Sequence, residues 1–195
     1  MVNAAVILAG GQGKRMKSDK PKVLCSVLGE PMLEWVITAC EKAEIANVCV
    51  VKGYRGEMLD KYISARSSRS EIVTVLQAEQ LGTGHAVMQA EDFLKQYMDG
   101  NILVLNGDAP FIDAETINSA LAQHIENDSA VTVVTARIEN PTGYGRVIRT
   151  DTGIAGIVEH KDCEPYQLAI TEVNSGCYWF KTAELLEVLG EIGND

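Results

Sequence analysis

Hydrophobic residues along the chain form short uninterrupted runs that alternate with longer amphipathic stretches. The runs are rich in β-branched and aliphatic residues, and this pattern predicts strands buried on both faces, at residues 4–9, 47–51, 72–76, 101–106 and 130–136. Between them, apolar residues recur at helical spacing over residues 32–43, 56–65, 82–97 and 113–125. Strands that alternate with helices in this way predict an α/β fold, with a mainly parallel sheet flanked by helices.

The pattern changes after about residue 140. Short strand patterns at 143–150 and 153–160 surround the turn residues at 151–153, which predicts a small β-hairpin insertion. Another strand pattern covers 172–180, and a helical pattern at 182–193 runs to the end of the chain without an obvious cap. We therefore expect a single domain over residues 1–195 that is truncated at its C-terminus.

Composition and charge narrow the range of partners. The formal net charge is −10, so the averaged field repels nucleic acid and anionic membranes, and no run approaches the roughly 20 apolar residues that a membrane span needs. The five cysteines are scattered and odd in number, which favours reduced thiols over a disulfide framework or a zinc site. We expect a soluble cytoplasmic protein that binds neither nucleic acid nor a membrane, whose oligomeric state the sequence leaves open.

A cluster of basic residues stands out against this acidic background. Five lysine and arginine side chains lie between residues 14 and 22, directly after a strand pattern and three glycines. A P-loop requires a serine or threonine after its lysine, whereas Arg15 follows Lys14. A dinucleotide-binding motif requires a third glycine where this chain has Met16. Neither common nucleotide motif is present.

The remaining pattern still favours phosphate binding. Glycine lets main-chain N–H groups approach phosphate oxygens, and Arg15 and Lys22 add positive charge at the same loop. The pattern resembles the loop that sugar-phosphate nucleotidyltransferases wrap around a nucleoside triphosphate. The alternative is a glycine turn flanked by solvated basic side chains.

A second string makes the resemblance closer. The segment LQAEQLGTGHAV at 76–87, together with 141–149, 156–162 and 172–180, is similar to the uridyltransferase domain of bacterial bifunctional N-acetylglucosamine-1-phosphate uridyltransferases/glucosamine-1-phosphate acetyltransferases. The resemblance covers essentially the whole chain. It implies a Rossmann-like nucleotidyltransferase fold with a mixed, mainly parallel sheet. We expect the family's C-terminal β-helix acetyltransferase domain to be absent.

The resemblance also implies roles for individual residues. The triphosphate would be bound by the catalytic pair Arg15 and Lys22. The uridine would be held by the backbone of Leu8, Ala9, Gly10 and Gly11, and by Gln77, Gly82 and Thr83. The amino sugar would be held by Gly145, Glu159 and Asn174, and Mg²⁺ by Asp108. The family usually has a small hydroxyl residue where this chain has Lys14, and it supplies a second metal ligand from beyond residue 195.

Chemistry supports these roles but leaves alternatives. Asp108 follows a strand, where a carboxylate suits Mg²⁺ but also commonly caps a turn. Gln77 and Thr83 offer the donors and acceptors that a pyrimidine edge requires, or they mark the start of a helix. Glu159 and Asn174 suit sugar hydroxyls, although such side chains often face water. The three histidines lack metal spacing, and His85 is expected to be a packing residue.

The activity implied by the resemblance is uridylyl transfer from UTP to N-acetylglucosamine-1-phosphate, giving UDP-N-acetylglucosamine and pyrophosphate. One alternative is a sugar-1-phosphate nucleotidyltransferase that uses dTTP and glucose-1-phosphate. Another is a sugar-nucleotide binding module without catalytic activity.

Overall fold

The computed structural model describes residues 2–13, 16 and 18–191, and it divides the chain into two compact units. Unit 1 contains Met1–Thr132 and Tyr178–Asp195, and unit 2 contains Val133–Cys177. Two strands, β7 (Val131–Arg137) and β10 (Glu172–Lys181), run from one unit into the other.

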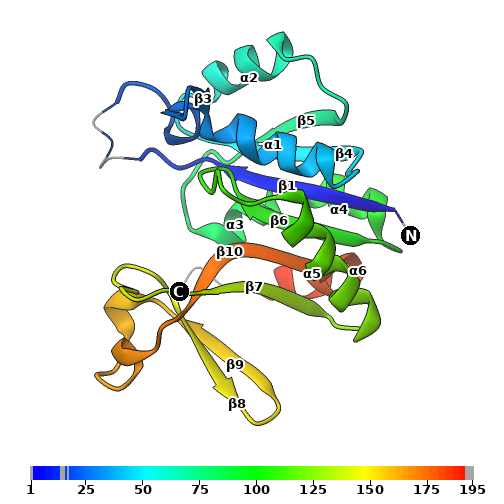
Figure 1. Ribbon diagram of the computed structural model, residues 1–195. Helices are drawn as coiled ribbons and strands as arrows, with labels where there is room; N and C mark the ends of the chain where they lie inside the picture. The colour runs from blue at the N-terminus through cyan, green and yellow to red at the C-terminus, as the bar shows by residue number, and fades with distance from the viewer. Residues whose placement is uncertain (1, 14–15, 17, 192–195) are drawn as a thin grey trace. The chain divides into compact units, whose positions relative to one another are not determined.

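Unit 1 is built on a parallel sheet, drawn in Figure 1. Its strands are β1 (Asn3–Ala9), β4 (Asn47–Lys52), β5 (Glu71–Leu76) and β6 (Asn101–Asn106). They are ordered β5-β4-β1-β6, with β10 next to β6. The pairs β1–β4, β1–β6 and β4–β5 are all parallel. The predicted α/β fold with a mainly parallel sheet is therefore confirmed.

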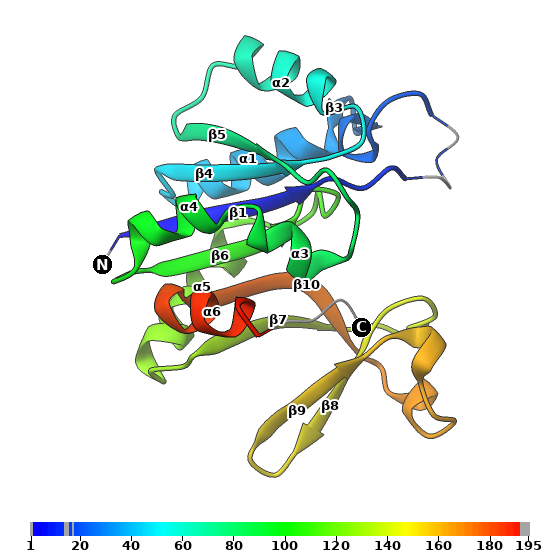
Figure 2. The same cartoon turned by 180° about the vertical axis from the view of Figure 1, so that it is seen from behind.

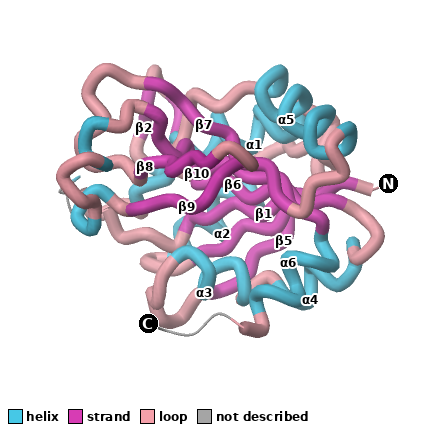
Figure 3. Tube along the Cα trace, turned by 90° about the horizontal axis from the view of Figure 1, so that it is seen from below, coloured by secondary structure: helices cyan, strands magenta, loops and turns pink. Residues whose placement is uncertain are grey.

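Helices cover both faces of this sheet (Figures 1, 2 and 3). One face carries α1 (Met32–Lys42) and α5 (Ala114–Glu126), while α2 (Gly56–Ala65) contacts β5. The other face carries α3 (Thr83–Met88), α4 (Glu91–Leu94) and α6 (Thr182–Leu189). Alternate strand residues such as Val6, Cys49 and Val104 pack with this second group of helices in one buried cluster.

Two predicted strands are less buried than their apolar composition indicated. In β5, Val73 is 39% exposed and Leu76 is 54% exposed, and in β7 Val131 is 45% exposed. The strand order explains β5, which lies at the edge of the sheet, whereas β1, β4 and β6 have neighbours on both sides and are almost fully buried. An apolar run alone does not distinguish an edge strand from a central one.

The helix expected over 82–97 is wrong as a single element. It is divided into α3, α4 and a 3-10 turn at Lys95–Tyr97. The break coincides with Gln89, whose side-chain amide donates to the His85 carbonyl at 3.1 Å. The Gln89 backbone N–H instead donates to Ala86 at 3.2 Å, which tightens the last turn of α3.

Unit 2 contains the predicted hairpin. It pairs β8 (Arg146–Thr150) with β9 (Gly153–Val158) in antiparallel fashion, and Gly153 has a φ of +139° in the turn. Strand β8 also pairs with β10 through Arg146 and Val173. An additional small sheet in unit 1, β2 (Ser26–Val27) with β3 (Glu30–Pro31), was not predicted because its strands are too short to show a period.

None of the five cysteines, all of which lie in the described part of the chain, forms a disulfide bond. Among the helices that the structure describes, none is long and apolar enough to span a membrane.

Candidate functional site

The register of the sheet in unit 1 gathers several of the predicted residues at one edge. Leu8 pairs with Asn106 on one side of β1, and Ala9 pairs with Lys52 on the other. Lys52 in turn pairs with Leu76. Because parallel strands end at the same edge, the residues that follow them, including Gly10, Gln77 and Asp108, emerge side by side.

A cleft of about 290 Å³ lies at this edge. Its lining comprises Leu8, Gly10, Gly11, Lys22, Val23, Gln77, Gln80, Gly82, Thr83, Ala86, Asn106 and Asp108. The structure thus brings together eight residues for which the sequence predicted nucleotide, phosphate or metal binding. Ala9 is only 1% exposed, belongs to the core and is not among the residues that line the cleft. Arg15 lies outside the described residues.

Close backbone contacts explain why glycine occupies the first position after β1. A Cβ atom on Gly10 would lie 2.8 Å from Oε1 of Gln77, and one on Gly53 would lie 2.6 Å from the Gly10 carbonyl oxygen. That carbonyl accepts hydrogen bonds from the Gln80 side-chain amide at 2.8 Å and from the Tyr54 backbone N–H at 3.2 Å. The turn is thus held by its neighbours without a side chain of its own.

The next part of the loop also depends on glycine. Gly13 has a φ of +62°, and a Cβ atom there would lie 2.6 Å from the Cβ of Lys22. The 3-10 helix at Lys22–Leu24 starts directly after Pro21, and its Val23 and Leu24 are buried. Burial of these neighbours fixes the base of Lys22 while its ammonium group reaches the cleft.

Lys22 and Asp108 form an ion pair at the wall of the cleft. Their side chains are 34% and 30% exposed, so both groups remain accessible to a ligand. A carboxylate at a strand end fits Mg²⁺, which binds one or two carboxylates and completes its shell with water and substrate phosphates. No group of three or more histidine, cysteine, aspartate or glutamate side chains that could hold a metal ion occurs in the described part of the chain. Among the described residues, Asp108 therefore offers such an ion only part of its ligand shell.

Gln77 is the most enclosed polar group of the cleft, with 5% of its surface exposed. Its amide nitrogen donates to the Gly82 carbonyl at 3.1 Å and lies 3.3 Å from Nδ1 of His85. His85, which the sequence analysis treated as a packing residue, therefore contacts a residue of the cleft wall.

Gln80 and Asn106 line the cleft but were missed by the sequence analysis. The sequence nevertheless contained an indication of both positions. Gln80 lies in the same QAEQLGTGHA string as Gln77, and Asn106 is the last residue of β6, two positions before Asp108.

The three residues predicted to bind the amino sugar meet in unit 2. A Cβ atom on Gly145 would lie 3.3 Å from Oε1 of Glu159 and 3.7 Å from the Cβ of Asn174. The Asn174 backbone N–H donates to the Gly145 carbonyl at 2.9 Å, and its side-chain oxygen accepts from the Gly176 N–H at 2.9 Å. Glu159 and Asn174 therefore both lie close to Gly145, where a Cβ atom would also come within 2.9 Å of Cγ2 of Ile157.

Two curated relatives match the whole chain in sequence. The chain is 44% identical over 195 residues to the bifunctional protein GlmU of Clostridium beijerinckii, covering all of this chain and 42% of the relative. It is 45% identical over 197 residues to the bifunctional protein GlmU of Latilactobacillus sakei, covering 41% of that relative. The resemblance noted from the sequence motifs is thus confirmed, and the chain spans about 42% of the length of such relatives.

Solved structures share the fold at low sequence identity. A putative glucose-1-phosphate thymidylyltransferase from Bacillus anthracis, in complex with sucrose, matches 98% of this chain and 79% of its own, with a TM-score of 0.80 and 19% identity. A UDP-glucose pyrophosphorylase complexed with UDP-glucose matches 98% of this chain and 80% of its own, with a TM-score of 0.81 and 16% identity. The nucleotidyl transferase family matches residues 4–194, nearly the whole chain, and this protein belongs to that family.

Proposed function

We propose that the chain transfers a uridylyl group from UTP to N-acetylglucosamine-1-phosphate, giving UDP-N-acetylglucosamine and pyrophosphate. The observation that carries the proposal is the pairing of Lys22 with Asp108 in a glycine-walled cleft at the carboxyl edge of the sheet. This edge is where open α/β sheets bind ligands. The identity to bifunctional GlmU proteins over the whole chain supports the same assignment.

The chemistry requires charge neutralisation more than proton transfer. A phosphate oxygen of the sugar phosphate attacks the α-phosphorus of UTP, and the bond from this phosphorus to the bridging oxygen breaks, so that pyrophosphate leaves with that oxygen. The attacking phosphate is already an anion and needs no general base. The cleft can supply this neutralisation, because the charged residues that line it are Lys22, a cation, and Asp108, a possible metal ligand.

The ion pair gives both charged residues a partner before the substrates bind. Nucleotide binding would draw the Lys22 ammonium toward the phosphates, and Asp108 would then be free to accept a magnesium ion. Mg²⁺ bound there would supply Lewis-acid stabilisation of the phosphate charge. Arg15 is proposed to add a second cation on the same loop. Gly145, Glu159 and Asn174 are proposed to hold the amino sugar.

Pyrophosphate release by the 195-residue chain tests the proposal. It is measured with UTP, N-acetylglucosamine-1-phosphate and Mg²⁺, beside a parallel reaction with dTTP and glucose-1-phosphate. We expect release with the first pair of substrates. Faster release with the second pair would favour the thymidylyltransferase alternative. A folded chain that binds UDP-N-acetylglucosamine but releases no pyrophosphate with either pair would be a binding module.

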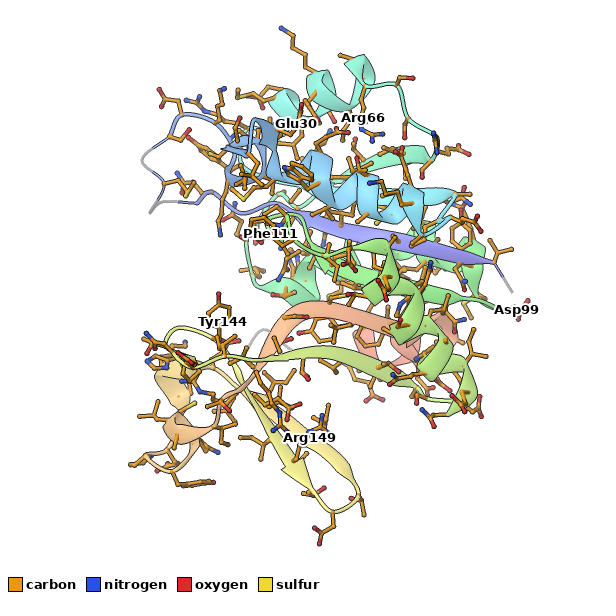
Figure 4. The ribbon with its side chains drawn as sticks, viewed as in Figure 1. Glu30, Arg66, Asp99, Phe111, Tyr144 and Arg149 are labelled. Carbon is orange, nitrogen blue, oxygen red and sulfur yellow. The ribbon has the colours of Figure 1, made fainter. Side chains whose placement is uncertain are left out.

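Asp108→Asn is the variant that tests the metal role. Because the amide is a neutral and weaker ligand, the Mg²⁺ concentration required for half-maximal turnover should rise at least about tenfold. Asp99→Asn is the matched control, because Asp99 precedes β6 and lies at the opposite end of this strand from Asp108 (Figure 4). An unchanged magnesium titration in Asp108→Asn would exclude this residue as the ligand.

A further inference from the structure

The side chain of Gln77 is oriented by His85, and the geometry at this contact determines which polar atom Gln77 offers to a ligand. The amide nitrogen of Gln77 lies 3.1 Å from the Gly82 carbonyl and 3.3 Å from Nδ1 of His85. An amide nitrogen has two hydrogens, so these two partners use both of them. Oε1 lies toward Gly10, and no residue in the described part of the chain donates to it.

The two ring nitrogens of a neutral His85 cannot both accept a hydrogen bond. Its other ring nitrogen lies 3.2 Å from the amide nitrogen of Gln89, but a neutral imidazole has only one acceptor nitrogen. Gln77 is 5% exposed and would leave buried groups unpaired if it rotated, whereas Gln89 is only half-buried and can exchange its partner for water. The lone pair at Nδ1 therefore belongs to Gln77, and the proton belongs to Nε2.

We propose that His85 is a positioning residue that sets base specificity: its Nδ1 atom holds the Gln77 amide so that the cleft presents a hydrogen-bond acceptor to the nucleobase. The ligand class selected is a pyrimidine with a ring N–H, namely uracil or thymine. Cytosine has a lone pair at the corresponding ring nitrogen and would place it against Oε1. This inference rests on the proposed function only in assuming that the cleft binds a pyrimidine nucleotide.

The consequence is an unusual mutational pattern. Without the Nδ1 acceptor, the Gln77 amide keeps only the Gly82 carbonyl as a partner. A rotated amide that offers an N–H group to the base then loses one hydrogen bond fewer, so discrimination between bases should decrease while the fold is kept. His85→Leu should therefore lower the ratio of UTP to CTP affinity by about tenfold, which is the effect of roughly one hydrogen bond. His85→Asn should preserve the ratio, because the asparagine oxygen offers an acceptor near the position of Nδ1.

The experiment measures dissociation constants of UTP and CTP by calorimetry for the wild type, His85→Leu, His85→Asn and the control Gln89→Ala. Gln89→Ala removes the other partner of the ring and should leave the ratio unchanged. ¹⁵N NMR of the ring in the nucleotide-free wild type, assigned by comparison with His85→Asn, should show the proton on Nε2.

Each possible outcome bears on the inference. A proton on Nδ1 would overturn it irrespective of nucleotide binding. Preference for UTP that persists in His85→Leu, or that is lost equally in His85→Asn, would also overturn it while leaving uridylyl transfer intact. If the wild type bound neither nucleotide, the proposed function and the inference from it would both fail, even with the expected tautomer.

Discussion

At the residue scale, the two neighbouring glycines after β1 have different roles. A Cβ atom on Gly10 would meet the Gln77 side-chain oxygen at 2.8 Å, whereas one on Gly11 would have no atom within 4 Å. Neither residue has a positive φ that would favour glycine. The requirement at Gly10 is therefore steric, and the space at Gly11 is open in the ligand-free protein.

This difference gives a matched pair of variants. Gly10→Ala should lower the free energy of unfolding by about 1–3 kcal/mol, because the turn or Gln77 must shift to relieve the overlap. Gly11→Ala should change it by no more than about 0.5 kcal/mol. Urea unfolding followed by circular dichroism measures both values. Equal destabilisation of the two variants would contradict the steric explanation.

At the element scale, α2 is joined to α1 by a largely enclosed cation. Arg66, the residue after α2, places Nε 2.8 Å from Glu34 and Nη1 2.6 Å from Glu41, and its side chain is 9% exposed. Figure 4 shows Arg66 at this end of α2. Hydrogen bonding to Arg66 lowers the pKa of Glu41 to about 2, so this carboxylate stays charged across the usual pH range.

Removal of the cation should destabilise the protein strongly. Arg66→Ala leaves the carboxylates of Glu34 and Glu41 without their cationic partner, and we expect it to lower the free energy of unfolding by about 3 kcal/mol. Lys95→Ala is the control, because Lys95 forms an exposed ion pair with Glu91, four residues earlier, and its loss should change the free energy of unfolding little. Chemical denaturation compares the two. Similar small effects would mean that the Arg66 network contributes no more than a surface pair.

The limits of the sequence analysis are also clearest at this scale. Long periodic segments and apolar runs located β1, β4, β6 and α1, because their patterns reflect burial on the faces of a sheet. The break between α3 and α4 was missed, since it depends on the Gln89 side chain competing for one carbonyl group. Motif strings located Lys22, Gln77 and Asp108, but they could not reveal the ion pair of Lys22 with Asp108, which forms only when distant segments meet. They also could not reveal the contact of Gln77 with His85, which depends on how the short loop between the two residues folds.

At the scale of the whole molecule, the pH dependence of stability should have two separate parts. Burial lowers the pKa of His124, and the charge of Lys181 adds to this effect against the opposing charges of Glu184 and Asp128. Nε2 of His124 has no hydrogen-bond partner in the described part of the chain. The folded state therefore resists protonation of this ring more than the unfolded state does.

The sign of the effect follows from this difference. Above the ordinary histidine pKa of about 6.5 both states are neutral, and stability is complete. Below it the unfolded state binds the proton first, so the free energy of unfolding should fall as pH decreases from about 6.5. Glu41 and Glu172, both with a pKa near 2, should add a second loss only below about 4.5.

Urea unfolding between pH 8 and pH 3 can separate the two parts. His124→Asn can keep the contact that Nδ1 of His124 makes with Thr132 at 2.9 Å. In this variant the free energy of unfolding should no longer fall just below pH 6.5, but it should still fall below pH 4.5. If the variant keeps the upper decrease, another group must cause it.

The division of the molecule into two units also predicts that the two proposed binding functions can be separated by mutation. The residues proposed to bind nucleotide line a cleft within unit 1, and Gly145, Glu159 and Asn174 meet within unit 2. Glu159→Gln removes a charged acceptor from the second group. It should raise the KM for N-acetylglucosamine-1-phosphate about tenfold or more, in line with the loss of a hydrogen bond to a charged group. The dissociation constant of UTP should stay within about twofold, because no residue of the nucleotide cleft is altered.

Asp151→Asn, at the exposed turn of the β8–β9 hairpin, is the control and should leave both constants unchanged. Weaker binding of UTP in Glu159→Gln, measured by calorimetry without the sugar phosphate, would show that the two groups of residues do not act independently.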